Sequence, residues 1–387
     1  MTTDPAPIPS EITPSDLARA LESAEPIQVL DVRAPASVTA GHVEAGPPHR
    51  FHNLVGSRVR AKDSLAAAGL DPTIPIAVVC GHGNDSKVVA HHLARLGARA
   101  RSLRGGMAAW MTLTVPRKLP TPAGVDHLIQ FDRLGKGALG YALVSDGAAL
   151  LIDPPRDASD YVRAVRNADS RVVGVADTHV HADYISGAPV LARALGVPYY
   201  LHAADMVYPY DGTPGRYPFH AVADGDTIAV GRATVRVRHT PGHTEGSVTY
   251  LLDGAAFTGD FLFIGSVGRP DLAGKTGEWT PRLWESIEAA RAEWSAPMMI
   301  YPAHYASDGE RRPDRAVGAS FGELLEKNTA LGIRDRAAFI GWVTGQTAPF
   351  PEAYKQIKAV NVGLLAVDDR QAEELEVGRN ECALGGR

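Results

Sequence analysis

A single cysteine is followed by a loop whose residue types favour sulfur chemistry. Cys80 comes directly after the apolar stretch 74–79 and precedes six small or polar residues: Gly81, His82, Gly83, Asn84, Asp85 and Ser86. A helix is expected to begin at the end of this loop, so backbone N–H groups and the helix dipole converge on an anion there. Because a thiolate or persulfide is such an anion, we predict that Cys80 is a nucleophile rather than a structural cysteine, and that the loop binds its substrate.

A second group consists of histidines and aspartates at spacings that suit a metal ion. Six of them occur in four short segments: His179, His181, Asp183, His243, Asp260 and His304. Any one histidine of this kind could be a hydrogen-bonded loop residue. Together they offer nitrogen and oxygen donors without cysteine, which suits zinc, iron or manganese. The joint pattern therefore predicts a metal site.

Apolar runs with strand character lead to these residues. Residues 172–176 precede His179, residues 235–237 precede His243, residues 255–257 precede Asp260, and residues 298–301 precede His304. If the four strands are neighbours, their ends place the potential ligands on one rim, as active-site loops of α/β proteins commonly do.

The first part of the chain alternates strands and helices. A strand at 27–30, a strand at 74–79 and a helix at 86–96 indicate an α/β domain with a mainly parallel sheet. Prolines between 112 and 124 predict a linker. We therefore expect a first domain at 1–115, a linker at 116–124, a second domain at 125–310, and a helical extension with a loosely packed tail at 311–387.

Composition narrows the class of protein. The 387 residues exceed one ordinary core, and 45% hydrophobic with 21% charged residues is typical of a globular enzyme. A net charge of -5 argues against a nucleic-acid partner.

The location of the protein is expected to be cytoplasmic. The sequence has no run of about 20 apolar residues that would span a membrane, and its N-terminal residues lack the pattern of a secretory signal. Two cysteines, Cys80 and Cys382, make no disulfide framework. A homodimer is the default expectation for a soluble enzyme.

The cysteine loop resembles the C-x-H-G-N-x-S active loop of single-domain rhodaneses. Three further stretches resemble marks of that family in the same order: residues 31–33 (Asp-Val-Arg), 41–43 (Gly-His-Val) and 103–110 (Leu-Arg-Gly-Gly-Met-Ala-Ala-Trp). The resemblance covers about residues 10–115 and implies a rhodanese-like α/β domain. It also implies that Cys80 accepts a sulfane sulfur as a persulfide and passes it to a thiol or another acceptor. Phosphatases of the same fold use C-x5-R, whereas this chain has Ser86 at the last position.

The histidine and aspartate segments resemble the metallo-β-lactamase superfamily. The resemblance covers about residues 125–310 and implies an αββα sandwich. Binuclear members read H-x-H-x-D-H, whereas the last position here is Tyr184, a phenol that is a poorer ligand near pH 7. One ligand expected for a second metal is therefore missing.

The departure at Tyr184 separates two branches of that superfamily. Glyoxalase II-like thiolester hydrolases use two metals, whereas persulfide dioxygenases hold one Fe(II) with two histidines and one aspartate. The resemblance to persulfide dioxygenases implies one Fe(II) per chain, with zinc as the alternative metal. Its ligands carry over to three residues: His179, His243 and Asp260. Three others would orient ligands and water or act as alternative ligands: His181, Asp183 and His304.

Two further stretches bear on the substrate. Residues 265–271 resemble the G-R-x-D stretch of persulfide dioxygenases, in which Arg269 would help to form the substrate pocket, although an ion pair with Asp271 explains it equally well. His304 is followed by Tyr305, where glutathione-using relatives often read P-A-H-D-Y. The identity of the thiol carrier therefore stays open.

Together these patterns predict an enzyme of sulfide and persulfide metabolism. The iron site would oxidise a low-molecular-weight thiol persulfide with O2 to sulfite, and Cys80 would transfer sulfur between thiosulfate and a thiol. One alternative is a zinc-dependent thiolester hydrolase with a regulatory or delivering rhodanese module. Another is a first domain that acts as a sensor or docking module and carries a persulfide to a partner. A nuclease of the same superfamily is disfavoured by the balanced charge.

Overall fold

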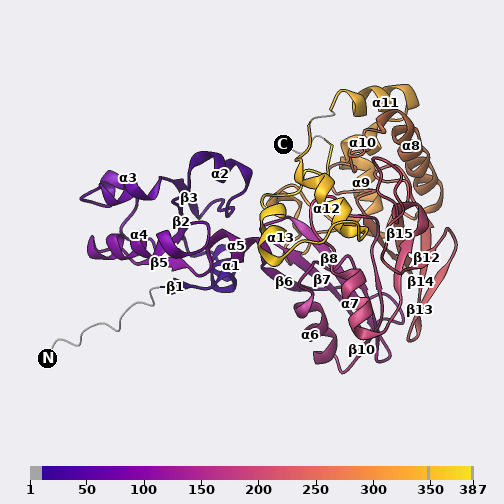
Figure 1. Cartoon of the computed structure of the whole chain (residues 1–387), viewed down its shortest axis with the longest axis horizontal. Coiled ribbons are helices and arrows are strands. Elements are labelled where there is room, and N and C mark those ends of the chain that lie inside the picture. The colour runs from indigo at the N-terminus through magenta and orange to yellow at the C-terminus, as the bar shows by residue number, and fades with distance from the viewer. Residues whose placement is uncertain (1–10, 347–348, 385–387) are drawn as a thin grey trace. The chain divides into compact units, whose positions relative to one another are not determined.

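The computed structural model describes residues 11–346 and 349–384 and divides the chain into two compact units (Figure 1). The first unit contains the chain up to Val115 together with Arg133–Lys136 and Val377–Arg379. The second contains Pro116–Asp132, Gly137–Glu376 and the segment that starts at Asn380. Each unit has its own hydrophobic clusters and its own candidate site, and the two are described separately below.

The first unit is a parallel α/β domain, as the sequence predicts. Its five strands lie in the order β1-β5-β4-β2-β3, and all neighbouring pairs are parallel. The strands are β1 (Glu11–Ile12), β2 (Gln28–Asp31), β3 (Arg50–Asn53), β4 (Ile76–Val79) and β5 (Ala100–Leu103). The helices are α1 (Pro14–Glu22), α2 (Pro35–Ala40), α3 (Gly56–Arg60), α4 (Asn84–Arg95) and α5 (Gly106–Thr112). Burial of all four residues of β4 explains why this strand is a continuous apolar run.

The second unit contains two sheets. The seven-stranded sheet has the order β12-β11-β10-β9-β8-β7-β6, and the six-stranded sheet has the order β13-β14-β15-β16-β17-β18. The first is built from β6 (Thr114–Leu119), β7 (His127–Arg133), β8 (Ala138–Ser145), β9 (Ala148–Ile152), β10 (Arg171–Ala176), β11 (Tyr199–His202) and β12 (His220–Val222). The second is built from β13 (Thr227–Val230), β14 (Ala233–His239), β15 (Val248–Leu252), β16 (Ala255–Gly259), β17 (Met299–Pro302) and β18 (Ala319–Ser320).

The two sheets pack face to face and helices cover their outer faces. Leu143 and Ile152 of the seven-stranded sheet share a buried cluster with Val235 and Phe257 of the six-stranded sheet. Outside this core, α6 (Ser159–Asn167) and α7 (Ala188–Leu195) pack on the seven-stranded sheet, and α8 (Thr276–Glu293) packs on the six-stranded sheet. The layers are therefore helix, sheet, sheet and helix, which confirms the predicted αββα sandwich.

The segment expected to be a linker contains a strand. Residues 116–119 belong to β6, which pairs at the edge of the seven-stranded sheet. Pro116 is tolerated there because an edge strand does not need every backbone N–H for pairing. The prolines therefore mark an edge strand in the first part of the predicted linker.

The C-terminal extension is helical but its tail is not loosely packed. It forms α9 (Phe321–Lys327), α10 (Thr329–Gly332), α11 (Arg336–Thr344), α12 (Ala353–Asn361) and α13 (Asp369–Leu375). Cys382 and Leu384 follow α13 and are 0% and 2% exposed. The expectation of a frayed tail is wrong for residues 380–384, because apolar side chains there enter the core and their backbone pairs with residues 266–269.

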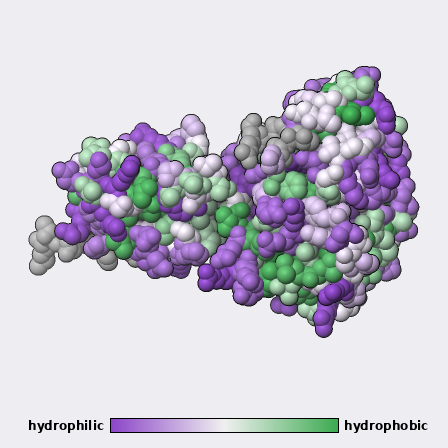
Figure 2. Space-filling view, turned by 45° about the horizontal axis from the view of Figure 1, so that its top comes forward, coloured by the Kyte–Doolittle hydropathy of each residue, from purple (hydrophilic) through white to green (hydrophobic). Residues whose placement is uncertain are grey.

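The surface shown in Figure 2 mixes hydrophilic side chains with smaller hydrophobic groups. Large hydrophobic residues are exposed at five described positions: Val88, Val190, Leu195, Leu365 and Val377. Isolated exposed apolar residues are ordinary on folded proteins. Within the described residues, no helix combines the length and apolar character needed to cross a bilayer.

Candidate functional site

The candidate metal ligands come from the ends of strands in both sheets. The strand before His179 is β10 of the seven-stranded sheet, whereas β14, β16 and β17 of the six-stranded sheet precede His243, Asp260 and His304. The expectation that all four strands are neighbours on one rim is therefore wrong. The site lies where the ends of two facing sheets meet, because a sandwich brings the loops of both layers to the same edge.

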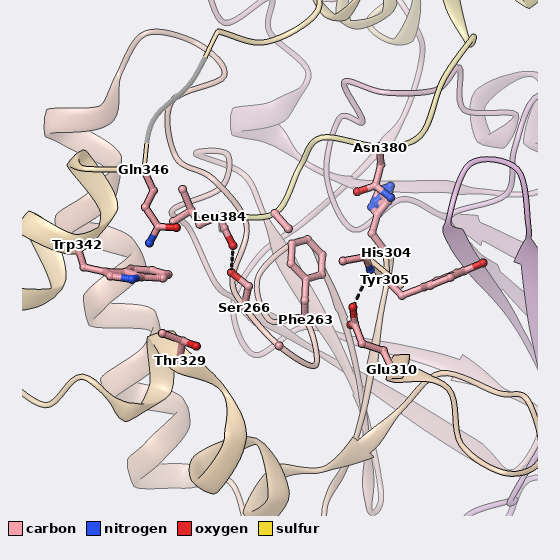
Figure 3. Close-up of a pocket in the computed structure, with 13 residues that line it drawn as sticks. Phe263, Ser266, His304, Tyr305, Glu310, Thr329, Trp342, Gln346, Asn380 and Leu384 are labelled. Carbon is pink, nitrogen blue, oxygen red and sulfur yellow. Dashed lines mark hydrogen bonds between the residues drawn. The ribbon is translucent and has the colours of Figure 1, made fainter. Parts of the chain in front are cut away.

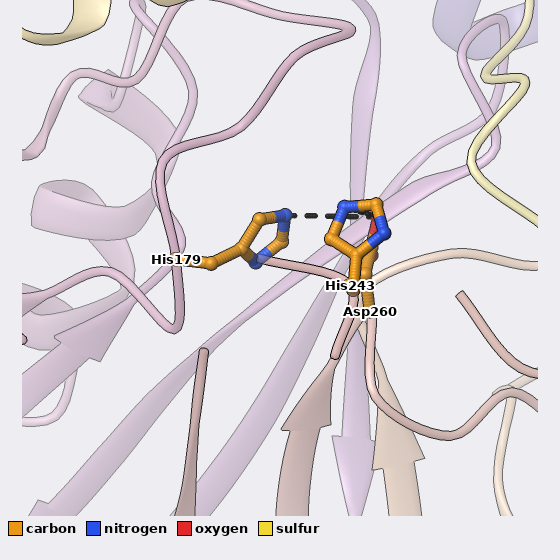
Figure 4. A group of neighbouring side chains, drawn as sticks. All are labelled: His179, His243 and Asp260. Atoms are coloured by element: carbon orange, nitrogen blue, oxygen red, sulfur yellow. Dashed lines mark ion pairs between the residues drawn. The ribbon is translucent and has the colours of Figure 1, made fainter. Parts of the chain in front are cut away.

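Three of the predicted ligands converge on one point (Figure 4). Oδ2 of Asp260 lies 3.6 Å from Nε2 of His179 and 3.4 Å from Nε2 of His243. The three residues are at most 1% exposed, and none of these three atoms has a hydrogen-bond partner. Leaving three buried polar atoms unsatisfied is costly unless a ligand binds them. The donor set of two imidazoles and one carboxylate fits a metal ion.

The other ring nitrogens of the two histidines are held by the protein. Nδ1 of His179 is 3.0 Å from Oγ1 of Thr178, and Nδ1 of His243 is 2.9 Å from the carbonyl oxygen of Arg269. Thr178 is in turn fixed by the carboxylate of Asp153. Hydrogen bonds of this kind orient each ring and leave Nε2 for a metal.

The electrostatic surroundings keep the three groups in the protonation states that a metal requires. Burial holds the pKa of His179 well below its usual value and also lowers the pKa of His243, so both rings are neutral. Burial alone would raise the pKa of Asp260, but the charge of His304 and its hydrogen bond hold that pKa well below its usual value. Neutral imidazoles and an ionised carboxylate are the forms that bind metal ions.

His181 is held apart from this group. Its Nε2 lies 3.1 Å from Oδ1 of Asp153 and 2.9 Å from the hydroxyl of Tyr184. Burial alone would lower the pKa of His181, but Asp153 and Asp177 raise it to about 9, which favours the protonated ring. Nδ1 of His181 is buried without a hydrogen-bond partner. Tyr184 stands where binuclear members of the superfamily have the last histidine of H-x-H-x-D-H, and its hydroxyl contacts His181.

Asp183 and His304 form a pair behind Asp260. Nε2 of His304 is 3.0 Å from Oδ2 of Asp183, and Nδ1 of His304 is 3.0 Å from Oδ1 of Asp260. The two oxygens of Asp260 thus face different neighbours. One faces the two candidate ligands, and the other accepts a hydrogen bond from His304.

Arg269 acts through its backbone as well as its side chain. Its guanidinium forms two 2.6 Å contacts with the carboxylate of Asp271, and both residues are buried. Its carbonyl oxygen fixes His243. The sequence left two roles open for Arg269, an ion pair with Asp271 or a part in the substrate pocket. The ion pair is present. Arg269 does not line the larger cavity described below.

Several residues near the site carry no motif in the sequence. Nδ2 of Asn361 donates to the carbonyl oxygens of His181 and Tyr184, each at 2.9 Å, and its Oδ1 accepts from the backbone of Ser186 at 2.9 Å. Lys358, one turn earlier on α12, is 1% exposed. Its protonated form contributes to the lowered pKa of His179 and His243, while burial lowers the pKa of Lys358 itself. These contacts join segments about 180 residues apart, and no local pattern predicts them.

Two cavities approach the site. A cavity of about 310 Å³ has His304 and Phe263 on one side, and Trp342 and Gln346 across from them (Figure 3). A smaller cavity of about 120 Å³ is lined by Val180 and Thr244, the residues that follow two of the candidate ligands, and by Lys358. The larger cavity is at the lower end of the size range for small-molecule pockets.

The cysteine site lies in the first unit, at the end of β4. Backbone N–H of Gly83 donates to Sγ of Cys80 at 3.1 Å, and the hydroxyl of Ser86 lies 3.2 Å from the same sulfur. Ser86 also contacts the hydroxyl of Ser102 at 2.8 Å. The loop and the start of α4 therefore surround the sulfur with hydrogen-bonding groups that stabilise negative charge.

The remaining loop residues are more open. His82, Asn84 and Asp85 are exposed, and Gly81 is half-buried. The loop is packed against the following turn, because N–H of Met107 donates to the carbonyl oxygen of Cys80 at 2.8 Å. At Gly106, whose φ is +60°, a Cβ atom would lie 2.4 Å from that oxygen, so this position requires glycine.

Comparison with known proteins agrees with both units. A model described as "Rhodanese-like domain" matches residues 13–113, and one described as "Metallo-beta-lactamase superfamily" matches residues 137–304. A hydroxyacylglutathione hydrolase from Acidiphilium cryptum is 36% identical over 49% of this chain and 76% of its own length. The chain belongs to the metallo-β-lactamase superfamily. It carries an N-terminal rhodanese-like domain in addition.

Two further relatives of the metallo-β-lactamase domain are informative. Human mitochondrial persulfide dioxygenase ETHE1 is 32% identical over 40% of this chain and 58% of its own length. A metallo-β-lactamase from Staphylococcus aureus subsp. aureus COL has a similar structure, with a TM-score of 0.54 and 28% identity over 62% of this chain and 74% of its own.

Asn361→Ala is expected to destabilise the metallo-β-lactamase domain. The change removes three hydrogen bonds and leaves two carbonyl oxygens and one N–H without their partner, at a cost of about 2–4 kcal/mol. Urea unfolding followed by tryptophan fluorescence measures the loss. Asn167→Ala, at an exposed position at the end of α6, is the matched control and should change stability little. Equal stability of the two variants would contradict the role of Asn361.

Ser86→Ala is expected to slow chemistry at Cys80. Loss of a hydrogen bond to a charged sulfur costs about 1.5–3 kcal/mol, which corresponds to a rate reduction of roughly 10–100-fold. The rate of sulfur transfer from thiosulfate measures the effect. Ser64→Ala removes an exposed hydroxyl elsewhere in the same unit and should leave the rate unchanged. A Ser86→Ala rate equal to that of the unaltered chain would exclude this contact from catalysis.

Proposed function

We propose that the chain is an iron(II) persulfide dioxygenase joined to a thiosulfate sulfurtransferase. At the metal centre, a low-molecular-weight thiol persulfide, O2 and water would give the thiol, sulfite and two protons. At Cys80, the sulfane sulfur of thiosulfate would pass to a thiol, which gives a thiol persulfide and releases sulfite. The observation that carries the first assignment is the convergence of His179, His243 and Asp260.

The donor set supports iron. Two histidines and one carboxylate on one side of a metal form the arrangement typical of non-haem iron(II) oxygenases, which leaves other coordination positions open. Iron(II) bound by these residues would supply the redox chemistry that allows O2 to react with a persulfide. Zinc has no redox chemistry and could not replace iron in this reaction.

The protein's own residues would prepare the reactants. Hydrogen bonds from the Nδ1 atoms of His179 and His243 to Thr178 and to the carbonyl oxygen of Arg269 hold the two imidazoles in place. Asp260 contributes negative charge to the metal and is itself fixed by His304. Burial lowers the pKa of Lys358, and in its protonated form this side chain would attract an anion such as a persulfide or sulfite, because opposite charges attract strongly where water is scarce.

Similarity to human persulfide dioxygenase supports the same reaction, and the rhodanese-like domain supports a substrate with sulfane sulfur. The carrier thiol is not identified by these observations. Of the described residues that line the larger cavity, none is Lys or Arg, so these residues offer no cation to the carboxylates of glutathione.

A zinc-dependent thiolester hydrolase is the second candidate. Two observations favour it: the 36% identity to a hydroxyacylglutathione hydrolase, and the unpartnered Nδ1 of buried His181. If His181 turned toward the metal and lost its proton, it would add a third nitrogen ligand of the kind that zinc prefers. Metal content and thiolester turnover distinguish the two candidates.

The dioxygenase is tested by O2 consumption. Protein loaded anaerobically with iron(II) and given freshly prepared thiol persulfides should consume O2 and form sulfite mole for mole. His243→Ala removes a proposed ligand, so bound iron and O2 uptake should both fall. Loss of a residue that only hydrogen-bonds to a metal ligand typically costs roughly 10–100-fold, and loss of the ligand itself should cost more. His220→Ala changes an exposed histidine of β12 and serves as the control.

The opposite result would favour the hydrolase. One bound iron with no O2 uptake for any persulfide, together with zinc-dependent cleavage of thiolesters, would overturn the dioxygenase assignment. Unchanged uptake in His243→Ala would exclude this residue as a ligand.

The role of Cys80 is tested separately. Cys80→Ala should abolish sulfur transfer from thiosulfate to a thiol, because the sulfane sulfur has no other acceptor in the loop. Iron-dependent O2 uptake with a supplied persulfide should persist, since the residues proposed for it lie in the other unit. Persulfide on Cys80, detected by mass spectrometry of the unaltered protein after treatment with thiosulfate, would identify the intermediate. Transfer that survives the substitution would refute the assignment.

A further inference from the structure

A groove lies between α6 and α7, on the side of the seven-stranded sheet that faces away from the other sheet (Figure 1). Its volume is about 570 Å³. Arg163 and Arg166 of α6 line one side, and Val190, Leu191 and Ala194 of α7 line the other. The groove therefore has one wall that carries charge and one that is apolar. Its lining shares no residue with the two cavities described above.

The apolar wall arises because α7 is apolar on both of its faces. Ala188 and Ala192 are buried against the sheet. The opposite stripe consists of Val190, Leu191 and Ala194 at helical spacing, and Val190 is 63% exposed. A helix that is apolar all round is normally covered on all sides. A continuous apolar stripe with polar groups beside it marks an interaction site, whereas a single exposed apolar residue does not.

The wall formed by α6 supplies positive charge. The side chain of Arg166 forms no ion pair or hydrogen bond with a described residue, while Arg163 pairs with Asp160. Arg156, just before the helix, also lines the groove and lies 2.6 Å from the exposed carboxylate of Asp369. Exposed ion pairs contribute little, so these arginines remain available to a ligand. Of the described residues that line the groove, none is Asp or Glu.

We propose that the groove binds an amphipathic helix of a partner protein, with its apolar side chains against α7 and its acidic side chains against the arginines of α6. Helices of 9 and 8 residues form the two walls, which are therefore about 12–14 Å long and match about two to three turns of a helix. Because Arg163 and Arg166 are one turn apart, acidic side chains one turn apart on the partner would meet both. An amphipathic helix in an apolar groove is a common mode of recognition.

Charge and shape favour this occupant over a second copy of the chain or a membrane. Two copies related by a two-fold axis through the groove would bring arginines close to arginines, which is repulsive. A bilayer surface would contact the protruding parts of the two helices and leave the concave groove unfilled. A separate acidic helix fills the groove and complements its charge.

The groove adjoins a loop that supports the proposed metal site. N–H of Gly187, which lines the groove, donates to the carbonyl oxygen of Pro154 at 2.9 Å. Pro154 follows Asp153, whose carboxylate accepts a hydrogen bond from the hydroxyl of Thr178 at 2.9 Å. Arg156 belongs to the same loop as Pro154. A partner bound in the groove would therefore contact the loop that orients Thr178.

Two fluorescent synthetic peptides test the proposal. Both form amphipathic helices of about three turns with the same leucines, and the positions beside the leucines carry Glu in one peptide and Lys in the other. The Glu peptide should bind the full chain at least about 10-fold more tightly than the Lys peptide, because it alone complements the arginines. Fluorescence anisotropy measures both affinities, and the preference should weaken as salt is added.

Charge reversal in the groove provides the variant. Arg163→Glu combined with Arg166→Glu should invert the preference, so that the Lys peptide binds more tightly than the Glu peptide. Val190→Asp should weaken binding of the Glu peptide by about 10-fold or more, because it places a charge in the apolar wall. Arg171→Glu and Leu365→Asp change exposed residues outside the groove and are the matched controls. Circular dichroism checks that each variant is folded.

Equal affinity for the two peptides, or an unchanged preference in the double arginine variant, would overturn the proposal. Binding to phosphatidylglycerol vesicles that the double variant abolishes would also overturn it and assign the groove to a membrane. Self-association of the chain that Val190→Asp abolishes would overturn it in favour of a second copy. Each measurement reports binding, so the result does not depend on O2 uptake or on the proposed function.

Discussion

The carboxylate of Asp260 is the group on which the arrangement of the second unit depends. It is 1% exposed, and a buried carboxylate is costly unless neighbouring groups compensate its charge. Its two oxygens have different surroundings. Oδ1 accepts a hydrogen bond from His304, and Oδ2 faces His179 and His243. Loss of His304 would leave Oδ1 without its hydrogen bond, whereas Oδ2 and Nε2 of the two other histidines have no hydrogen-bond partner and are stabilised only when a ligand binds them.

That constraint explains why two sheets and a helical extension are all needed. The loop after β10 brings His179 from one sheet, and strands of the other sheet bring Asp260 and His304. The loop that carries His181 has no regular structure of its own, so its carbonyl groups require partners from elsewhere. Asn361 on α12 supplies them. The extension therefore completes the site even though it lies outside the residues matched by the family model.

The sequence predicts the parts of this structure that depend on local patterns. Apolar runs that end in polar loops locate the strands and the candidate ligands, and the Cys80 loop resembles a known active loop. Contacts between distant segments are not encoded locally. This is why the position of β10 in the other sheet, the role of Asn361 and the burial of Cys382 were not foreseen. Pro116 led to the prediction of a linker for a related reason. Only the order of the strands shows that Pro116 belongs to β6 at the edge of a sheet, where proline is tolerated.

Under the proposed function, the two units would stabilise sulfur anions by different physical means. In the first unit, neutral donors act on Cys80: the backbone N–H of Gly83 and the hydroxyl of Ser86. In the second unit, the proposed metal ion would supply positive charge to a sulfur anion. Under the proposed function, the thiol persulfide released by the first reaction is the substrate of the second. The residues proposed for each site lie within one unit, so a diffusible carrier would be sufficient to connect the two reactions.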